Sequence, residues 1–313
     1  MRFFSMKKCY FFFFFFTIFL LHFSCKKQDI TAAYLVLTKE DFEDCVNVDN
    51  FNKVHEQVYD SLELASIKQH NFRDVMVSIN GTNLGYWQLP CKIPLLPDYS
   101  GKNNIRVTPC ARVVNTTLTA TPYYFVEPIE RFFDIEKEEI IEFKNAKFEY
   151  VRGVEFPLLE TFSQTTSFKP VDTVFTSSME IHYDAELKKN VGRVLLEDTV
   201  NFFNVASKYF YLNSYGSRHF WEMNYKCESG EIHTYLEFKN AVTGVEYQAM
   251  IIYPTTAKWK KTYIDLSQII SQVSGTADRV YVRLGITGYS KSGVSKANFY
   301  FDNIKLITMP APY

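Results

Sequence analysis

Apolar and polar residues alternate in several segments of the C-terminal half, and this pattern restricts the fold more than any other feature of the chain. Side chains of a β-strand point alternately to its two faces, so each such segment predicts a strand with one buried face. In residues 220–227 the buried face would carry Trp221, Met223, Tyr225 and Cys227. The segments that read as strands are 191–196, 208–213, 219–226, 232–239, 247–253, 261–266, 280–286 and 297–307.

Composition supports the same fold class. Aromatic residues make up 17% of the 313 residues, and aromatic side chains favour strands. In the N-terminal half, 74–79 alternates and leads into Asn80-Gly81, which is a strong hairpin signal. We therefore predict an all-β protein, with a small β domain over 31–145 and a β-sandwich over 146–308.

The closing strand carries a resemblance to a known fold. Asn298-Phe299-Tyr300-Phe301-Asp302-Asn303-Ile304-Lys305-Leu306, together with the strands before it, resembles the galactose-binding-like jelly roll of many carbohydrate-binding modules. That resemblance implies a jelly roll, a glycan ligand and a structural calcium, for which the matching residues are Glu160 and Asp302. The alternative is that both carboxylates are ordinary structural acids. Residues 73–113 resemble the small PEGA-type β domains of envelope proteins.

The N-terminus predicts export. Basic residues precede an apolar run over 9–23, and small Ser24 is followed by Cys25 and two lysines. This is the architecture of a secretory signal over 1–24, too short to span a membrane permanently. The segment 20–27 resembles the lipobox of bacterial lipoproteins, in particular those of Bacteroidota. It implies that Cys25 is acylated, begins a tether over 25–30 and anchors the protein at the outer membrane. The alternative is an ordinary secretory signal with an incidental cysteine.

The net charge of the chain limits the classes of partner that it can bind. The formal net charge is −1, and removing residues 1–24 removes three basic residues and no acidic one, which leaves −4. A nucleic-acid partner is therefore not expected, because it requires a basic face.

Exported proteins can form disulfides, and Cys91 and Cys110 are the first pair to consider because they flank what reads as one hairpin. Buried free thiols are the alternative.

Catalytic motifs are absent from the sequence: it contains no HExxH, GxSxG, GxxxxGK[ST] or GxGxxG pattern. We therefore expect a protein that is not an enzyme and has no cofactor other than the calcium that the jelly-roll resemblance implies. The predicted outward strand faces instead carry aromatic and charged side chains suited to contact with a glycan or an envelope protein. The candidate binding residues are Glu222, His233, Tyr235, Tyr281 and Arg283.

Three functions remain open from the sequence. The first is a non-catalytic envelope lipoprotein whose jelly roll binds glycan or a protein partner. The second is a structural subunit of a surface secretion, motility or adhesion complex. The third is a glycan-active enzyme, which would need two carboxylates facing each other across a cleft.

Overall fold

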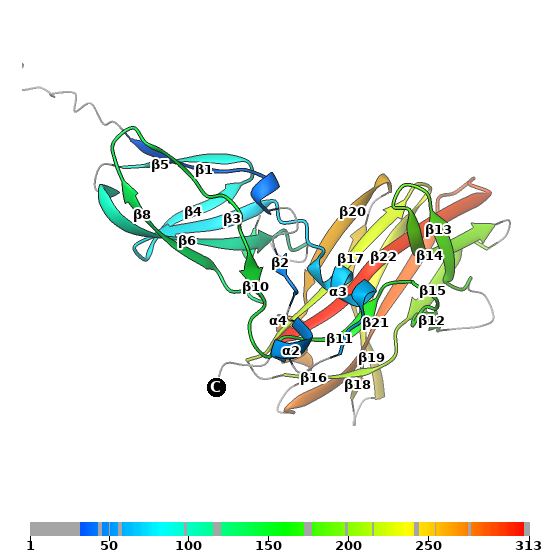
Figure 1. Cartoon of the computed structure of the whole chain (residues 1–313). Coiled ribbons are helices and arrows are strands. Elements are labelled where there is room, and N and C mark those ends of the chain that lie inside the picture. Colours follow the sequence, from blue (N-terminus) through cyan, green and yellow to red (C-terminus); the bar gives the residue numbers. More distant parts are fainter. Residues whose placement is uncertain are drawn as a thin grey trace, which may run out of the picture.

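The fold comes from a computed structural model, and it is built almost entirely of strands (Figure 1). The residues that the structure describes are 32–42, 46–49, 51–55, 58–96, 99–114, 120–171, 177–197, 200–214, 216–240, 244–253, 255–274 and 277–309. The predicted all-β class is confirmed. The predicted signal over 1–24 and the predicted tether that Cys25 begins lie outside the described residues. None of the described helices combines the length and the apolar character needed to cross a membrane.

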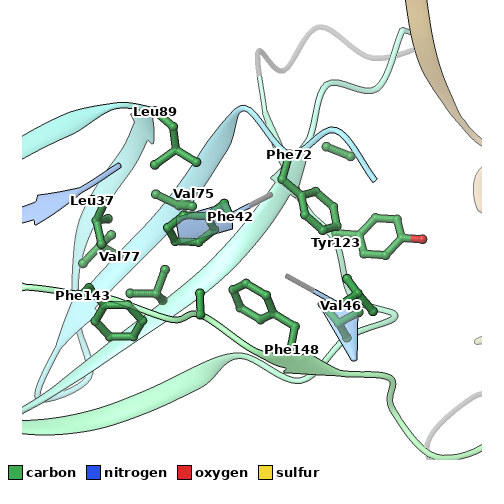
Figure 2. Packing of buried hydrophobic residues seen from close by; sticks show 14 of the residues in the cluster. Leu37, Phe42, Val46, Phe72, Val75, Val77, Leu89, Tyr123, Phe143 and Phe148 are labelled. Carbon is green, nitrogen blue, oxygen red and sulfur yellow. The ribbon is translucent and has the colours of Figure 1, made fainter. Parts of the chain in front are cut away.

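The N-terminal unit, residues 33–150, packs two sheets against each other. The first has the order β5-β1-β9, and in the second β3 lies between β4 and β6, with β7 and β8 on the other edge of β6. The strands are β1 (Ala33–Leu37), β3 (Asp74–Ile79), β4 (Thr82–Gln88), β5 (Cys91–Leu95), β6 (Gly101–Ala111), β7 (Thr121–Pro122), β8 (Ile129–Ile135) and β9 (Ile140–Glu142). Figure 2 shows Leu37, Val75, Val77 and other apolar side chains gathered into the core of this unit.

The predicted hairpin after 74–79 is confirmed. Ile79 pairs with Thr82, and Asn80 and Gly81 both have positive φ, as a type I′ turn requires. The predicted hairpin linking Cys91 and Cys110 is wrong. β5 pairs with β1, whereas β6 pairs with β3, and the two cysteines are free thiols.

The segment between β1 and β3 contains short helical elements that the sequence analysis did not assign. They are η1 (Glu40–Phe42), α2 (Phe51–His55) and α3 (Ser61–Lys68), with the short strand β2 (Val46–Asn47) between the first two. Asp60 caps α3: its carboxylate accepts from the backbone N–H groups of Leu62 and Glu63, and the Glu63 side chain accepts from the N–H of Asp60. This reciprocal capping box defines where the helix begins.

The C-terminal sandwich, residues 155–309, consists of two six-stranded sheets. The back sheet has the order β13-β14-β22-β17-β20, with β11 also paired to β22; the front sheet has the order β12-β15-β21-β18-β19, with β16 also paired to β21. The back-sheet strands are β11 (Glu155–Glu160), β13 (Glu180–Asp184), β14 (Lys189–Glu197), β17 (Arg218–Cys227), β20 (Thr256–Asp265) and β22 (Lys296–Met309). The front-sheet strands are β12 (Lys169–Pro170), β15 (Phe202–Ala206), β16 (Phe210–Asn213), β18 (Gly230–Asn240), β19 (Gly244–Tyr253) and β21 (Arg279–Ser290).

All eight strands predicted for this half are present, and one helix, α4 (Ser267–Ser274), follows β20. The predicted alternation is also confirmed. Trp221, Met223 and Tyr225 are buried in the core between the sheets, so Trp221 is a packing residue.

The boundary between the two units lies later in the chain than the expected position near residue 145. Strand β10 (Phe148–Glu149) pairs with β2, and pairing within the sandwich starts at β11.

The two units are joined by a buried contact between α3 and the outer face of the back sheet (Figure 1). Lys305 of β22 donates to the carbonyls of Ser66 and Gln69 at the end of α3, at 3.3 and 3.2 Å. Asn303 adds hydrogen bonds to the Ser66 carbonyl and to the Gln69 side chain. Positive charge at a helix C-terminus is favourable because the carbonyl groups there lack partners within the helix.

A single carboxylate lies at the centre of this contact. Glu222 of β17 is fully buried, and its Oε2 is 3.1 Å from the Nζ of Lys305 and 3.0 Å from the Nζ of Lys261. Tyr123 of the N-terminal unit donates to Oε1 at 2.5 Å. In Figure 2 the Tyr123 hydroxyl points away from the rest of the labelled core. We call Glu222, Lys261, Lys305, Tyr123 and His70 the junction cluster.

Burial and neighbouring charges shift the pKa values in the junction cluster. Burial alone would raise the pKa of Glu222, but Lys305 and Lys261 hold it well below its usual range. Burial lowers the pKa of Lys305, and the Glu222 carboxylate opposes that shift by favouring the charged ammonium. The pKa of His70 is lowered well below 6.5 by burial and by Lys305, so its imidazole is neutral.

We expect Glu222→Gln to destabilise the protein by about 3–5 kcal/mol, because it leaves two buried lysines without a counter-charge. Chemical denaturation at pH 7.5 measures the loss. The matched control is Glu180→Gln, which breaks the exposed pair with Arg193 and should cost less than about 1 kcal/mol. Equal losses in the two variants would contradict a central role for Glu222.

We expect acid to weaken the junction. A histidine whose pKa is lowered in the folded state binds its proton more readily when unfolded, so stability falls as the pH drops below 6.5. The slope contributed by His70 can reach about 1.4 kcal/mol per pH unit. Glu222 adds to the loss below its unfolded pKa, since its folded pKa is depressed. Denaturation curves from pH 7.5 to 5 should show this slope, and His70→Gln should flatten it; an unchanged slope would rule His70 out.

Candidate functional site

Four of the five predicted binding residues lie together on the outer face of the front sheet. On β18 they are His233 and Tyr235, and on β21 they are Tyr281 and Arg283. The two strands are antiparallel neighbours, in register so that Tyr235 lies opposite Gly285 and Glu237 opposite Arg283. Residues that alternate with them on the two strands, such as Leu236 and Val282, are buried in the core. We call this outer surface the front face.

Tyr235 lies across the sheet because its neighbour on β21 has no side chain. A Cβ built on Gly285 would be 1.9 Å from Cζ of Tyr235 and 2.3 Å from both of its Cε atoms, so the end of the ring occupies that space. The Tyr235 hydroxyl donates to Oδ1 of Asn204 on β15 at 2.8 Å, which fixes the ring across the strand. The ring is half-buried against the sheet and partly exposed on the front face.

Three further tyrosine rings gather at one end of the front face. Tyr209 and Tyr281 are stacked, with centroids 4.7 Å apart and planes 16° from parallel. Tyr211 lies opposite Tyr281 on β16, 4.4 Å away between centroids, and 68% of its surface is exposed. Lys239 lies over the rings of Tyr209 and Tyr281, at 4.3 and 5.5 Å.

A buried carboxylate supports the middle of the front face. Glu237 is 1% exposed, receives a hydrogen bond from the Tyr209 hydroxyl and is paired with Arg283 at 2.6 Å. The Arg283 guanidinium also lies 4.9 Å from the Tyr209 ring centroid. Burial alone would lower the pKa of Arg283, but the pairing with Glu237 raises it, so the guanidinium stays charged.

The opposite end of the front face carries a second aromatic group. Tyr289 lies 4.9 Å from Phe202 and 5.1 Å from His233, measured between ring centroids, and it is 42% exposed. His233 contacts the Glu231 carboxylate at 2.8 Å. Beside Tyr289 is a hollow of about 380 Å³ lined by Gly230, Glu231, Thr255, Tyr289, Ser290 and Lys291.

Glu222 does not belong to this site. It lies on the back sheet, where the N-terminal unit covers it, and its carboxylate is bonded within the junction cluster. The prediction that it is available to a ligand is wrong. Alternation correctly turned Glu222 away from the sandwich core, but the outer face of the back sheet is itself buried at this point.

The calcium pair implied by the jelly-roll resemblance does not fit a shared site. Glu160 lies opposite Ile304, a core residue, and accepts from the backbone of Phe162 and Ser167 and from the Ser167 hydroxyl. Asp302 lies opposite Asn224 on the outer side of the back sheet, 2.8 Å from Lys189. The carboxylates therefore face opposite sides of one sheet. Within the described parts of the chain, no three His, Cys, Asp or Glu side chains group in a way that could hold a metal ion.

The sequence analysis missed several front-face residues. Tyr289 continues the alternation of β21 beyond the predicted strand end at 286, and Lys239 is the last residue of the predicted strand 232–239 but was not included among the candidates. Tyr209 precedes β16, and its place beside Tyr281 depends on the pairing of β16 with β21. Pairing between strands about 70 residues apart has no local sequence signal.

No protein-family model matches the chain, and neither does any curated protein. Similar solved structures are carbohydrate-binding modules. One is the CBM22-1–GH10 part of a Clostridium thermocellum endo-1,4-β-D-xylanase complexed with xylohexaose, with 11% identity over 50% of this chain and 29% of that one, at a TM-score of 0.37. Another, from the β-sandwich superfamily, has 10% identity over 75% and 85% of the two chains, with a TM-score of 0.35. A family 11 module from Clostridium thermocellum has 16% identity over 51% and 97% of the two chains, with a TM-score of 0.32. At these TM-scores the likenesses carry no argument about the ligand.

We expect Gly285→Ala to displace the Tyr235 ring and break its hydrogen bond to Asn204, since the added Cβ overlaps the ring. The cost should be about 1–3 kcal/mol, the usual range for overpacking. Thermal or chemical denaturation measures it, and the nuclear Overhauser contacts of the Tyr235 ring report its movement. Thr287→Ala, on the same strand, is the control and should change stability by less than about 0.5 kcal/mol. A Gly285→Ala protein with an unmoved ring would contradict this description.

Proposed function

We propose that the protein is a non-catalytic, lipid-anchored envelope protein that binds glycan on the front face of its C-terminal sandwich. The observation that carries the proposal is the Tyr235 ring, which lies across Gly285 and is partly exposed on the front face. A ring held in this way offers an apolar surface to the face of a sugar, and its hydroxyl position is already fixed by Asn204. The Tyr235 side chain would therefore lose little conformational entropy when a sugar binds.

The surroundings of Tyr235 supply the polar part of such a site. His233 and Arg283 lie beside it on the same face, and Arg283 is held in place by Glu237. Charged side chains form directional hydrogen bonds to hydroxyl and carboxylate oxygens. An apolar ring with a few fixed polar groups is the usual composition of a small-molecule site.

Anchoring through Cys25 completes the proposal. The lipobox-like segment 20–27 supports it, since acyl chains on Cys25 would contribute about 0.8 kcal/mol for each buried CH₂. The polar segment 26–29 would then separate the first strand, β1, from the membrane surface. Cell fractionation of a Cys25→Ser variant tests the anchor: the variant should leave the membrane fraction.

A glycan-binding screen on the full chain, purified in detergent with and without calcium, tests the binding function. We expect at least one glycan to bind, and Tyr235→Ala to weaken it about tenfold or more, or ~1.4 kcal/mol. Tyr235→Phe keeps the ring and should retain most of the affinity.

Tyr300→Ala is the matched control, because Tyr300 is a half-buried tyrosine on the outer face of the back sheet. Binding that is equally sensitive to Tyr235→Ala and Tyr300→Ala would move the site away from the front face. No binding by the folded protein would favour the alternative function, a structural subunit of an envelope complex.

A further inference from the structure

The stacked pair Tyr209 and Tyr281, at one end of the front face, is packed against two cationic side chains. Lys239 lies 4.3 Å from the Tyr209 ring centroid, Arg283 lies 4.9 Å from it, and Tyr281 is stacked on the same ring. Aromatic faces attract ammonium and guanidinium groups. The Tyr209 ring is therefore packed against Tyr281 and two cations, and the partly exposed Tyr235 ring lies on the same face of the sheet.

The charges around this tyrosine pair do not balance. Glu237 is paired with Arg283, and among the described residues Lys239 has no ion pair with a carboxylate. Glu231 lies eight residues from Lys239 along β18, about 26 Å at ~3.3 Å per residue, and it contacts His233. Glu246 on β19 lies opposite the core residue Phe238, so it faces the other side of the sheet. Among the described residues, this end of the front face therefore has two cations, Arg283 and Lys239, and one carboxylate, Glu237, which is paired with Arg283.

The Lys239 and Arg283 cations lie on the same face of the sheet as the Tyr235 ring. Arg283 is two residues from Gly285 on β21, about 6.6 Å along the strand, and Lys239 is two residues beyond Glu237 on β18. A sugar stacked on Tyr235 could therefore place a substituent between Arg283 and Lys239. Arg283 and Lys239 are donors without acceptor atoms, so they suit an anionic oxygen group better than a hydroxyl.

We propose that the front face selects anionic glycans, with a carboxylate or sulfate group of the sugar bound between Lys239 and Arg283. This proposal rests on the glycan-binding function proposed above and specifies its ligand class. Uronic acids and sulfate esters present the same chemistry, negatively charged oxygens on a sugar ring, and binding measurements can distinguish them.

Matched polymers test the charge requirement. Polygalacturonate and its fully methyl-esterified form share a backbone and differ in the carboxylate charge, and dextran sulfate and dextran differ in the sulfate. We expect the purified full chain to bind at least one charged polymer about tenfold or more tightly than its neutral counterpart at 0.15 M salt. Higher salt should weaken that binding, because the two cations are partly exposed. The charged polymer that binds identifies carboxylate or sulfate as the preferred group.

Two substitutions with opposite expected effects separate this role from a structural one. Lys239→Gln should weaken binding of the charged polymer about tenfold, since it removes a cation that pairs with no carboxylate in the described part of the chain. Glu237→Gln keeps the side-chain shape and removes the competing carboxylate, so it should tighten that binding. Lys258→Gln, at an exposed lysine on β20 of the back sheet, is the control for net charge and should leave binding unchanged.

Each outcome decides between the two proposals. Equal affinity for charged and neutral polymers, with loss on Tyr235→Ala, would overturn the anionic preference and keep the glycan-binding function. Charged-polymer binding that Lys258→Gln and Lys239→Gln weaken equally would show non-specific charge attraction and overturn the assignment to Lys239 and Arg283. Absence of binding to every polymer, and to the wider glycan screen, would overturn both.

Discussion

The pairing of one buried carboxylate with two buried lysines determines how this molecule is put together. Glu222, Lys261 and Lys305 are each almost completely removed from solvent, and charges in such a position are stable only when they are matched. The matching groups come from both units, because Tyr123 and the carbonyls at the end of α3 complete the hydrogen bonding. The N-terminal unit is therefore fixed on the back sheet, and the front sheet, which carries the proposed binding face, lies on the other side of the sandwich.

The strands could be predicted because their signal is local. Alternation identified β17, β18 and β21, and Asn80-Gly81 identified the hairpin of β3 and β4. The helix α3 was missed in a polar stretch, although Asp60 and Glu63 form a capping box that its sequence spacing permits. The Cys91–Cys110 hairpin was wrong because β5 pairs with β1, far away along the chain. Long-range pairing of this kind leaves no trace in a short window of sequence.

Part of the candidate site could also be predicted from local sequence. Alternation separates inward from outward side chains, so it placed Tyr235, Tyr281 and Arg283 on one face. It cannot tell an outward face that meets solvent from one that another unit covers, and Glu222 is wrong for that reason. Glu160 and Asp302 do not fit the implied calcium site for a related reason, since neighbouring strands place the two carboxylates on opposite sides of the back sheet. The support that Gly285 gives to Tyr235 requires the register between β18 and β21, which depends on tertiary structure.

The position of β22 in the chain has a consequence for how the protein assembles. Its residue Asn303 bonds to Ser66 of α3, 237 residues earlier, and β22 also pairs with β11, β14 and β17. The helix cannot find these partners until the final strand has been synthesised and, in an exported protein, translocated. Until then Glu222 lacks Lys305, and the apolar side chains that β22 will cover stay open to other chains. The N-terminal unit, although it leads the chain, would thus be among the last parts to reach its final stability.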